Sequence, residues 1–317
     1  MVTEPRQIDV IAILGPSYCG STLLSYVLNT DDELFGGSEL RRLVERNDTV
    51  VCDICGPQCR IWTRENIDQF AGSDGKAQFY QRIAAIVNKS LIVDSSKIHT
   101  FFSDDFIAEQ ESQGVRFSFL LPLKHPLRLF ASYVYNDFFR KRGHRASNYD
   151  EVRSALSGPL RDEVMNTFLP AAAERCFRLY NVFFKRFVRS PEMSTFTLKH
   201  EEFVRPNGVK LLEEIVTKAT GYAPSLDCEN FSAYEAHPIG GNRGPYWQTR
   251  LQRDQNFSSS DARFKYYREK RGAQLDEKYR LVFTSDMLKE IESWEITQKL
   301  SSLLMYDDDS NALAAPG

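Results

Sequence analysis

The sequence predicts an α/β fold with a central parallel sheet flanked by helices, and three observations favour this class. Short apolar runs alternate along the chain with longer stretches of helical periodicity, which is the element order of βαβ units. The runs are almost continuously apolar, as expected for strands buried on both faces of a parallel sheet. With 42% hydrophobic and 26% charged residues, the 317-residue chain has the composition of an ordinary globular protein.

Four apolar runs are predicted to be strands. They cover residues 8–14, 91–93, 116–123 and 194–198. Because ligands bind beyond the carboxyl ends of the strands in such sheets, we expect the functional residues in the loops that follow these four runs.

Helical patterns fill the intervals between the runs. They cover residues 21–29, 63–88, 126–140, 161–189 and 207–220, with breaks expected at Gly72 and Gly75. Ser38 is predicted to cap a short helix that carries Glu39 in its first turn and ends near Arg46.

We expect one domain over residues 1–306 and a disordered tail over residues 307–317. The length is generous for one domain but does not require two. The tail, DDDSNALAAPG, is polar and rich in small residues. No feature of the sequence predicts the oligomeric state.

Charge and hydropathy exclude two classes of partner. The net charge of −3 provides no field that would attract nucleic acid, and no stretch approaches the ~20 apolar residues needed to span a bilayer. The first residues are polar and contain no secretory leader, and the six cysteines do not form a disulfide framework. We therefore expect a soluble, cytoplasmic protein without a membrane span.

The segment from Gly15 to Thr22 carries the main functional motif. A strand, a glycine-bounded loop and a helix start follow one another here, and this geometry binds phosphate through backbone N–H groups. The pattern G-x-x-x-x-G-S-T matches a Walker A loop except that Ser21 replaces its lysine. Because that lysine neutralises the phosphates of a nucleoside triphosphate, the loop suits a single phosphate-like group better than a triphosphate.

The same loop resembles the signature of the sulfotransferases that use 3′-phosphoadenosine-5′-phosphosulfate (PAPS), roughly G-x-x-R-S-G-S-T-L-L. The chain looks like a bacterial-type member related to the carbohydrate and tyrosylprotein sulfotransferases. The resemblance implies a P-loop-like, sulfotransferase-type sheet and a 5′-phosphosulfate held by Ser17, Tyr18, Cys19, Gly20, Ser21 and Thr22. The departures are Tyr18, where most members carry arginine or lysine, and Cys19 in place of serine.

Two further segments resemble cofactor-binding elements of this family. Lys124-His125-Pro126 ends a strand, and Ser132 follows Lys124 by eight residues, as in the R-D-P-R-x-x-x-x-S element that binds the 3′-phosphate. Arg128 lies one helical turn before Ser132 and is expected to help. The HPIGGNR segment resembles an H-x-I-G-G-N-P loop, which implies cofactor contacts from Gly241 and Asn242.

The resemblance also implies catalytic roles for Glu39 and Lys97. Glu39 follows Tyr18 by 21 residues, in the context where related enzymes place a general base. A carboxylate that only favours a helix dipole is the alternative at this position. Lys97, in the DSSK segment, would stabilise charge on the transferring sulfuryl group and its bridging oxygen.

The implied reaction moves the sulfuryl group of PAPS to a hydroxyl of a small-molecule or carbohydrate acceptor by in-line attack. The products are a sulfate ester and 3′-phosphoadenosine 5′-phosphate, and no metal is required. Tyr18 supplies no positive charge at neutral pH. Either Lys97 and one of Arg243, Arg250 and Arg253 replace that charge, or catalysis is slow or lost.

Two other functions stay open at this point. A small-molecule kinase is suggested by Asp94, which follows a strand as a Walker B aspartate would, although the Walker lysine is missing. A non-catalytic protein that retains the fold is suggested by Tyr18 and Lys124.

Cys52, Cys55 and Cys59 form a separate cluster with C-x-x-C spacing. A structural zinc site needs four ligands, so Cys228 or a histidine would have to complete it, and we favour a disulfide or three buried thiols. His237 is a candidate second base or a cap of the turn that follows it. Cys19 is either a reactive thiol at a helix N-terminus or a replacement for the loop serine.

Overall fold

The computed structural model describes residues 7–45, 49–140, 149–205, 207–241, 243–258, 264 and 277–306. Its centre is a sheet of five parallel strands in the order β2-β3-β1-β4-β5. The strands are β1 (Ile8–Leu14), β2 (Leu34–Ser38), β3 (Leu91–Lys97), β4 (Val115–Leu123) and β5 (Thr195–Lys199). The predicted α/β class with a parallel sheet flanked by helices is confirmed.

Strand β2 is the one that the sequence reading missed. Ser38 ends this strand instead of capping a helix, and the short helix α2 (Arg42–Glu45) begins only at Arg42. The paired glycines conceal the strand because they are poor strand formers. Gly36 is needed for another reason: a Cβ atom there would lie 2.3 Å from the Ser25 carbonyl oxygen, so only glycine lets helix α1 (Ser21–Leu28) pack this closely.

Strand β1 is buried on both faces and separates two apolar clusters. Val10, Ala12 and Leu14 belong to the larger cluster, whereas Ile11 and Ile13 pack with residues of α1 and α12 (Gly208–Thr220). This double burial explains why the run 8–14 is continuously apolar in the sequence.

Two of the predicted helices, 126–140 and 161–189, are confirmed but include turns of π-helix. Residues 126–140 form α7 (Pro126–Tyr133) and a π-helical stretch (Val134–Arg140). Residues 161–188 form α9 (Arg161–Glu163), a π turn (Val164–Phe168), α10 (Leu169–Phe183) and a second π turn (Phe184–Val188).

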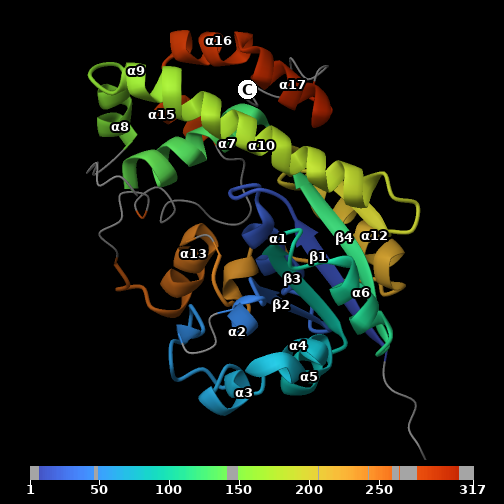
Figure 1. Ribbon diagram of the computed structural model, residues 1–317. Helices are drawn as coiled ribbons and strands as arrows, with labels where there is room; N and C mark the ends of the chain where they lie inside the picture. Colours follow the sequence, from blue (N-terminus) through green and yellow to red (C-terminus); the bar gives the residue numbers. More distant parts are fainter. Residues whose placement is uncertain are drawn as a thin grey trace, which may run out of the picture.

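The remaining helices pack against the sheet or against other helices. They are α3 (Arg64–Asp68), α4 (Gly72–Ala77), α5 (Phe79–Val87), α6 (Asp104–Glu111), α8 (Tyr149–Leu156), α11 (His200–Phe203), α13 (Arg243–Arg253), α15 (Lys278–Val282), α16 (Ser285–Ser293) and α17 (Glu295–Leu303), with a 3-10 turn (Phe231–Ala233). Figure 1 shows α10 lying across the upper part of the view above the sheet, with α16 and α17 on its outer side. None of the described helices is long and apolar enough to cross a membrane. The predicted tail, 307–317, lies outside the described residues.

The sheet brings the functional loops to one edge. Leu14 at the end of β1 pairs with Lys97 at the end of β3, and Asp94 of β3 pairs with Ser38 of β2. Because all strands are parallel, the residues that follow β1, β2 and β3 meet beyond the same carboxyl ends.

Candidate active site

The loop between β1 and α1 has the backbone shape that its glycines suggest. Gly15 and Gly20 have φ values of 123° and 104°, and Tyr18 between them also has a positive φ of 72°. Gly20 precedes α1 without a side-chain cap, and the first helical bond runs from the Leu24 N–H to the Gly20 carbonyl. The N–H groups of the first turn of α1 therefore precede the helical hydrogen-bond ladder, as in anion sites at helix N-termini.

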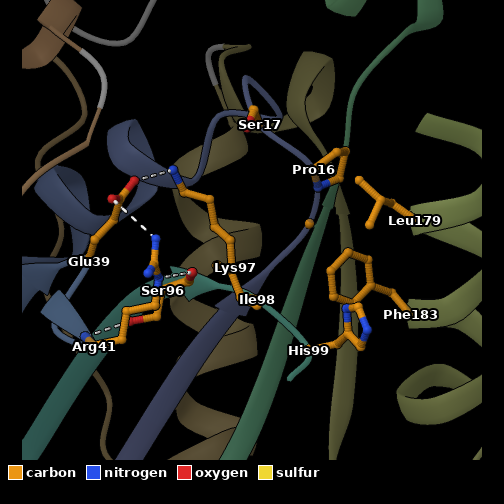
Figure 2. A pocket seen from close by; sticks show the side chains of 11 residues that line it. Pro16, Ser17, Glu39, Arg41, Ser96, Lys97, Ile98, His99, Leu179 and Phe183 are labelled. Atoms are coloured by element: carbon orange, nitrogen blue, oxygen red, sulfur yellow. Dashed lines mark hydrogen bonds and ion pairs between the residues drawn. The ribbon is translucent and has the colours of Figure 1, made fainter. Parts of the chain in front are cut away.

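A cavity of about 320 Å³ opens beside this loop. Its lining joins residues from four parts of the chain: Gly15, Pro16, Ser17, Glu39, Arg41, Ser96, Lys97, Ile98, His99, Leu179 and Phe183. In Figure 2, Glu39 and Lys97 lie on one side, and Leu179 and Phe183 of α10 lie on the other. The volume is at the low end of the range of about 300–1,000 Å³ for small-molecule sites.

Glu39 and Lys97 face each other at this cavity. The Lys97 ammonium lies 3.0 Å from Glu39 Oε1, and the Arg42 guanidinium lies 2.6 Å from Oε2. Burial raises the pKa of Glu39, but Lys97 and Arg42 outweigh burial and hold it below its ordinary value. Glu39 is therefore an ionised carboxylate at neutral pH.

Two residues with strained backbone conformations orient the side chains of Glu39 and Lys97. Ser38 and Lys97 end neighbouring strands with φ values of 59° and 65°, in the left-handed region that non-glycine residues rarely adopt. Such positions cost of the order of 1–3 kcal/mol and are found most often at functional sites. The turn at Ser38 directs the chain to Glu39, and the conformation of Lys97 sets the direction of its own side chain.

Tyr18 does not contribute charge to the loop. Its hydroxyl donates a 2.7 Å hydrogen bond to Asp137 on the π-helical stretch after α7, and its ring packs edge-on against Tyr133. Lys124, which is buried, reaches the same loop and donates to the Tyr18 carbonyl oxygen at 3.3 Å. A positive charge thus lies at the loop, but it comes from the end of β4 and not from position 18.

Cys19 stands at the loop position where the resembling family carries serine. It is buried and is not a reactive thiol. Burial raises the pKa of Cys19, although the positive charges of Lys97 and Lys124 oppose this effect. The side chain is fully buried and its Sγ lies 3.9 Å from the Leu14 carbonyl oxygen. Burial, and not the nearby helix start, decides the reactivity of this thiol.

The residues expected at the 3′-phosphate each have a partner within the protein. Arg128 is buried between Glu201, at 3.3 Å, and Glu277, at 3.0 Å, so its charge is already paired. The Ser132 hydroxyl donates to the Arg128 carbonyl within helix α7, and Lys124 is turned toward the loop. This pairing disfavours the expected help from Arg128 at the 3′-phosphate, which stays a prediction.

Of the glycine-rich segment, Gly241 lies next to the loop helix and Asn242 lies outside the described residues. A Cβ atom on Gly241 would come within 2.9 Å of the Thr22 side chain. Two arginines proposed as replacements for the missing charge point elsewhere: Arg250 donates to the Ile54 carbonyl oxygen, and Arg253 lies 3.8 Å from Cys55 Sγ. The side chain of Arg243 lies outside the described part.

Comparisons with known proteins found only distant matches. No protein-family model matches the sequence, and no curated protein matches it. Among solved structures, the chain is similar to two sulfotransferase domains. The sulfotransferase domain from the curacin biosynthetic pathway has 16% identity over 95% of this chain and 99% of that chain, with a TM-score of 0.49. The sulfotransferase domain from the Synechococcus PCC 7002 olefin synthase has 14% identity over 97% and 98%, with a TM-score of 0.46.

Asp94 is a structural carboxylate and not a magnesium ligand. It is fully buried, with one oxygen 2.8 Å from the Tyr80 hydroxyl and the other accepting from the Ser96 N–H, also at 2.8 Å. These bonds hold Ser96 and thus the strand end that carries Lys97. The kinase interpretation, which needs Asp94 at a metal, has no support in this geometry.

His237 lies in the cysteine cluster and not at the cavity. Its Nδ1 is 3.3 Å from Cys59 Sγ and 3.5 Å from Cys55 Sγ, so the role of a second base is wrong. All six cysteines lie in the described part of the chain and are free, so of the two favoured alternatives, a disulfide or three thiols, the disulfide is not formed. The sequence reading missed two partners: His237 for the cysteines, and Asp137 for Tyr18. His237 had one available signal, because three clustered cysteines lack a fourth ligand. No signal marked Asp137.

Proposed function

We propose that this protein transfers the sulfuryl group of PAPS to the hydroxyl of a small-molecule acceptor at the cavity beside the β1–α1 loop. The observation that carries the proposal is the Glu39–Lys97 pair, which lies 3.0 Å apart and lines the same cavity as the loop. An anion-binding loop, a lysine and an ionised carboxylate are the three groups that sulfuryl transfer to a hydroxyl needs.

The loop residues fit the 5′-phosphosulfate of the donor. The N-terminus of α1 and the positive-φ glycines offer backbone N–H groups to an anion, and Lys97 and Lys124 supply the charge that Tyr18 lacks. When bound, PAPS supplies the sulfuryl group and a phosphate leaving group.

Glu39 is assigned as general base, and its pairing with Lys97 links proton transfer to donor binding. In the unliganded protein Lys97 holds Oε1, so the carboxylate is ionised but a weak base. A phosphosulfate at the loop attracts the Lys97 ammonium and weakens its hold on Oε1. The acceptor O–H then gives its proton to Glu39 while its oxygen forms the bond to sulfur and the bond from sulfur to the phosphate oxygen breaks. Lys97 neutralises the negative charge that develops on the leaving oxygen.

The wall of the cavity favours an acceptor with an apolar body. Leu179 and Phe183 of α10 and Ile98 after β3 line the side away from Glu39 (Figure 2). A phenol or an alkyl alcohol buries its ring or chain against these side chains, whereas an acidic glycan would leave them unmatched. We therefore propose an aromatic or aliphatic alcohol as the acceptor class.

Titration calorimetry with 3′-phosphoadenosine 5′-phosphate and with magnesium ATP tests the proposal. We expect the bisphosphate to bind, and we expect PAPS to be consumed when a panel of phenols and alkyl alcohols is added. Lys97→Met should lower turnover by about 10²–10³-fold, the usual effect of removing one transition-state donor. Lys218→Met, on the exposed side of α12, is the matched control and should leave turnover unchanged.

If magnesium ATP binds and the bisphosphate does not, the proposal is contradicted and the kinase interpretation is favoured. Binding of the bisphosphate without turnover of any acceptor would favour the non-catalytic alternative.

A further inference from the structure

The three clustered cysteines have a fourth partner that only the fold supplies. The ligand atoms of Cys52, Cys55, Cys59 and His237 all lie within 4.8 Å of one another. The histidine comes from the other end of the domain, 178 residues after Cys59. Cys52, Cys59 and His237 are buried, and Cys55 is half-buried.

Two sulfur-to-nitrogen distances are close to those of a tetrahedral metal site. Zinc binds cysteine sulfur at about 2.3 Å and histidine nitrogen at about 2.0–2.1 Å, so the sulfur-to-nitrogen edge of a tetrahedron is about 3.6 Å. His237 Nδ1 lies 3.5 Å from Cys55 Sγ and 3.3 Å from Cys59 Sγ. The imidazole therefore already presents one nitrogen to the sulfurs at a ligand's spacing.

The outer partner of His237 is the kind that zinc-bound histidines have. Nε2 lies 2.9 Å from the Glu235 carboxylate, which fixes the ring so that Nδ1 faces the sulfurs. A carboxylate–histidine–zinc arrangement of this type orients the ring and raises its basicity as a ligand. The other oxygen of this carboxylate pairs with Arg60 at 2.5 Å, which holds Glu235 beside the ring.

Backbone and arginine contacts favour thiolates at the cysteines. The Cys55 N–H donates to Cys52 Sγ at 3.4 Å, and the Trp62 N–H donates to Cys59 Sγ at 3.3 Å. Arg253 of α13 lies 3.8 Å from Cys55 Sγ. Three thiolates and one neutral histidine around Zn²⁺ carry a net charge of −1, which this guanidinium partly neutralises.

The first two cysteines are held in a tight turn. Cys52 and Gly56 form an antiparallel bridge, with the Gly56 N–H 2.8 Å from the Cys52 carbonyl oxygen. Gly56 has a φ of 65°, so glycine at this position lets the chain reverse directly after C-x-x-C. The turn presents both sulfurs on the same side before any ion binds.

We propose that Cys52, Cys55, Cys59 and His237 bind one Zn²⁺ ion as a structural site. Four protein ligands leave no open position, which distinguishes a structural zinc from a catalytic one. The choice of metal follows from the donor set, three soft thiolates and one imidazole whose ligand atoms lie within 4.8 Å of one another.

This site clamps the segment that supports Glu39. Asp53 donates its N–H to the Pro238 carbonyl, and the Trp62 indole donates to the His237 carbonyl at 2.6 Å. Ile239, two residues after the histidine, accepts from the Glu39 N–H at 2.9 Å and donates to the Gly37 carbonyl at 3.0 Å. Zinc binding thus joins the cysteine loop to the end of β2, next to the carboxylate at the cavity.

Metal analysis of the full chain, purified without chelator, is the direct test. We expect one zinc per chain by inductively coupled plasma mass spectrometry. Cys52→Ser and His237→Ala should lose the zinc, whereas Cys228→Ser, outside the cluster, should keep it. Zinc-free wild-type protein that takes up no zinc after reduction would overturn the proposal, as would an intact mass that shows a disulfide within the cluster.

Two further measurements keep the test decisive if a ligand variant does not fold. Cobalt exchanged into the wild-type chain should give the intense visible absorption of tetrahedral cobalt, and His237→Cys should retain the metal with a shifted spectrum. Glu235→Ala removes no ligand and should weaken zinc affinity by about 10–100-fold. A cobalt spectrum of an octahedral ion, or unchanged affinity in Glu235→Ala, would count against the site.

A separate measurement tests the connection between the zinc site and the cavity. Removal of zinc by a chelator should speed hydrogen exchange at the Glu39 and Ile239 amides. Unchanged exchange rates at these two amides would show that the zinc site does not stabilise the segment that supports Glu39. None of these measurements requires sulfuryl transfer, so their failure is distinguishable from failure of the proposed function.

Discussion

Glu39 is held by two cations, and those contacts determine how it ionises. Lys97 and Arg42 contact different oxygens of its carboxylate, and its side chain is only 12% exposed. Their charges outweigh burial, so the pKa of Glu39 lies below 4.5. In the proposed mechanism, Glu39 therefore accepts a proton only after Lys97 has moved its interaction to the donor.

Glu39→Gln should lower turnover by about 10²–10⁴-fold, the range of general-base catalysis, and should leave binding of the bisphosphate product intact. In the wild type, kcat/KM should fall only below pH 4.5, because activity needs the ionised form and loses it as pH falls through the depressed pKa. Glu45→Gln, at an exposed carboxylate that pairs with Arg41, is the control. An acid limb well above pH 4.5 would contradict this assignment.

The charge at the loop comes from Lys124, and a pair of variants separates its role from that of Tyr18. Lys124→Met should weaken binding of the bisphosphate by about 10–100-fold, because a hydrogen bond to a charged group contributes about 1.5–3 kcal/mol. Tyr18→Phe removes the hydrogen bond to Asp137 and should cost about 1 kcal/mol of stability with little change in binding. Calorimetry and urea unfolding give the two values, and a larger binding loss in Tyr18→Phe would reverse the assignment.

At the scale of elements, the site depends on how closely α1 and β2 approach each other. The Ser25 carbonyl of α1 leaves no room for a side chain at Gly36, and the Ser38 N–H donates to the Ser25 hydroxyl at 3.3 Å. This contact places the end of β2, and with it Glu39, beside the loop that precedes α1. A short strand with two glycines is therefore a positioning element of the site.

Gly36→Ala should destabilise the protein by about 1–3 kcal/mol, the usual cost of overpacking, because its Cβ atom would meet backbone that cannot move away. Gly158→Ala is the matched control, since a Cβ atom there meets nothing closer than 3.5 Å and its effect should be near zero. Urea unfolding of both variants measures the difference, and equal stabilities would show that α1 can shift.

At the scale of the whole molecule, a buried carboxylate makes stability depend on pH. Burial raises the pKa of Asp94 to about 6, although hydrogen bonds from Ser96 and Tyr80 oppose this shift. Between pH 4 and pH 6 the folded state therefore binds more protons at Asp94 than the unfolded state does. The contribution of Asp94 to the free energy of unfolding falls as pH rises through this window.

Asp94→Asn should remove this slope. Relative to the variant, the wild type should lose about 3 kcal/mol of stability between pH 4 and pH 6, the free energy that corresponds to the shift in pKa. Chemical unfolding of both proteins across this range measures the difference in slope, which does not depend on how the variant changes stability at any single pH. Parallel curves would mean that Asp94 titrates normally.

Local sequence patterns predict the α/β class, four of the five strands, the long helices and the glycine-bounded loop before α1. Each of these is a local pattern: an apolar run buried on both faces, a helical period, or a glycine-bounded turn. The sequence also singled out Glu39 and Lys97, whose roles stay proposals, through their spacing from the loop.

Which side chains meet depends on how the chain folds. Strand β2 was hidden because its glycines serve the packing of α1, which no local pattern reveals. Lys124 reaches the loop from β4, Arg128 is bound to Glu201, and His237 joins cysteines 178 residues away. Such contacts depend on how the parallel sheet orders its strands, and that order brings together residues that are far apart along the chain.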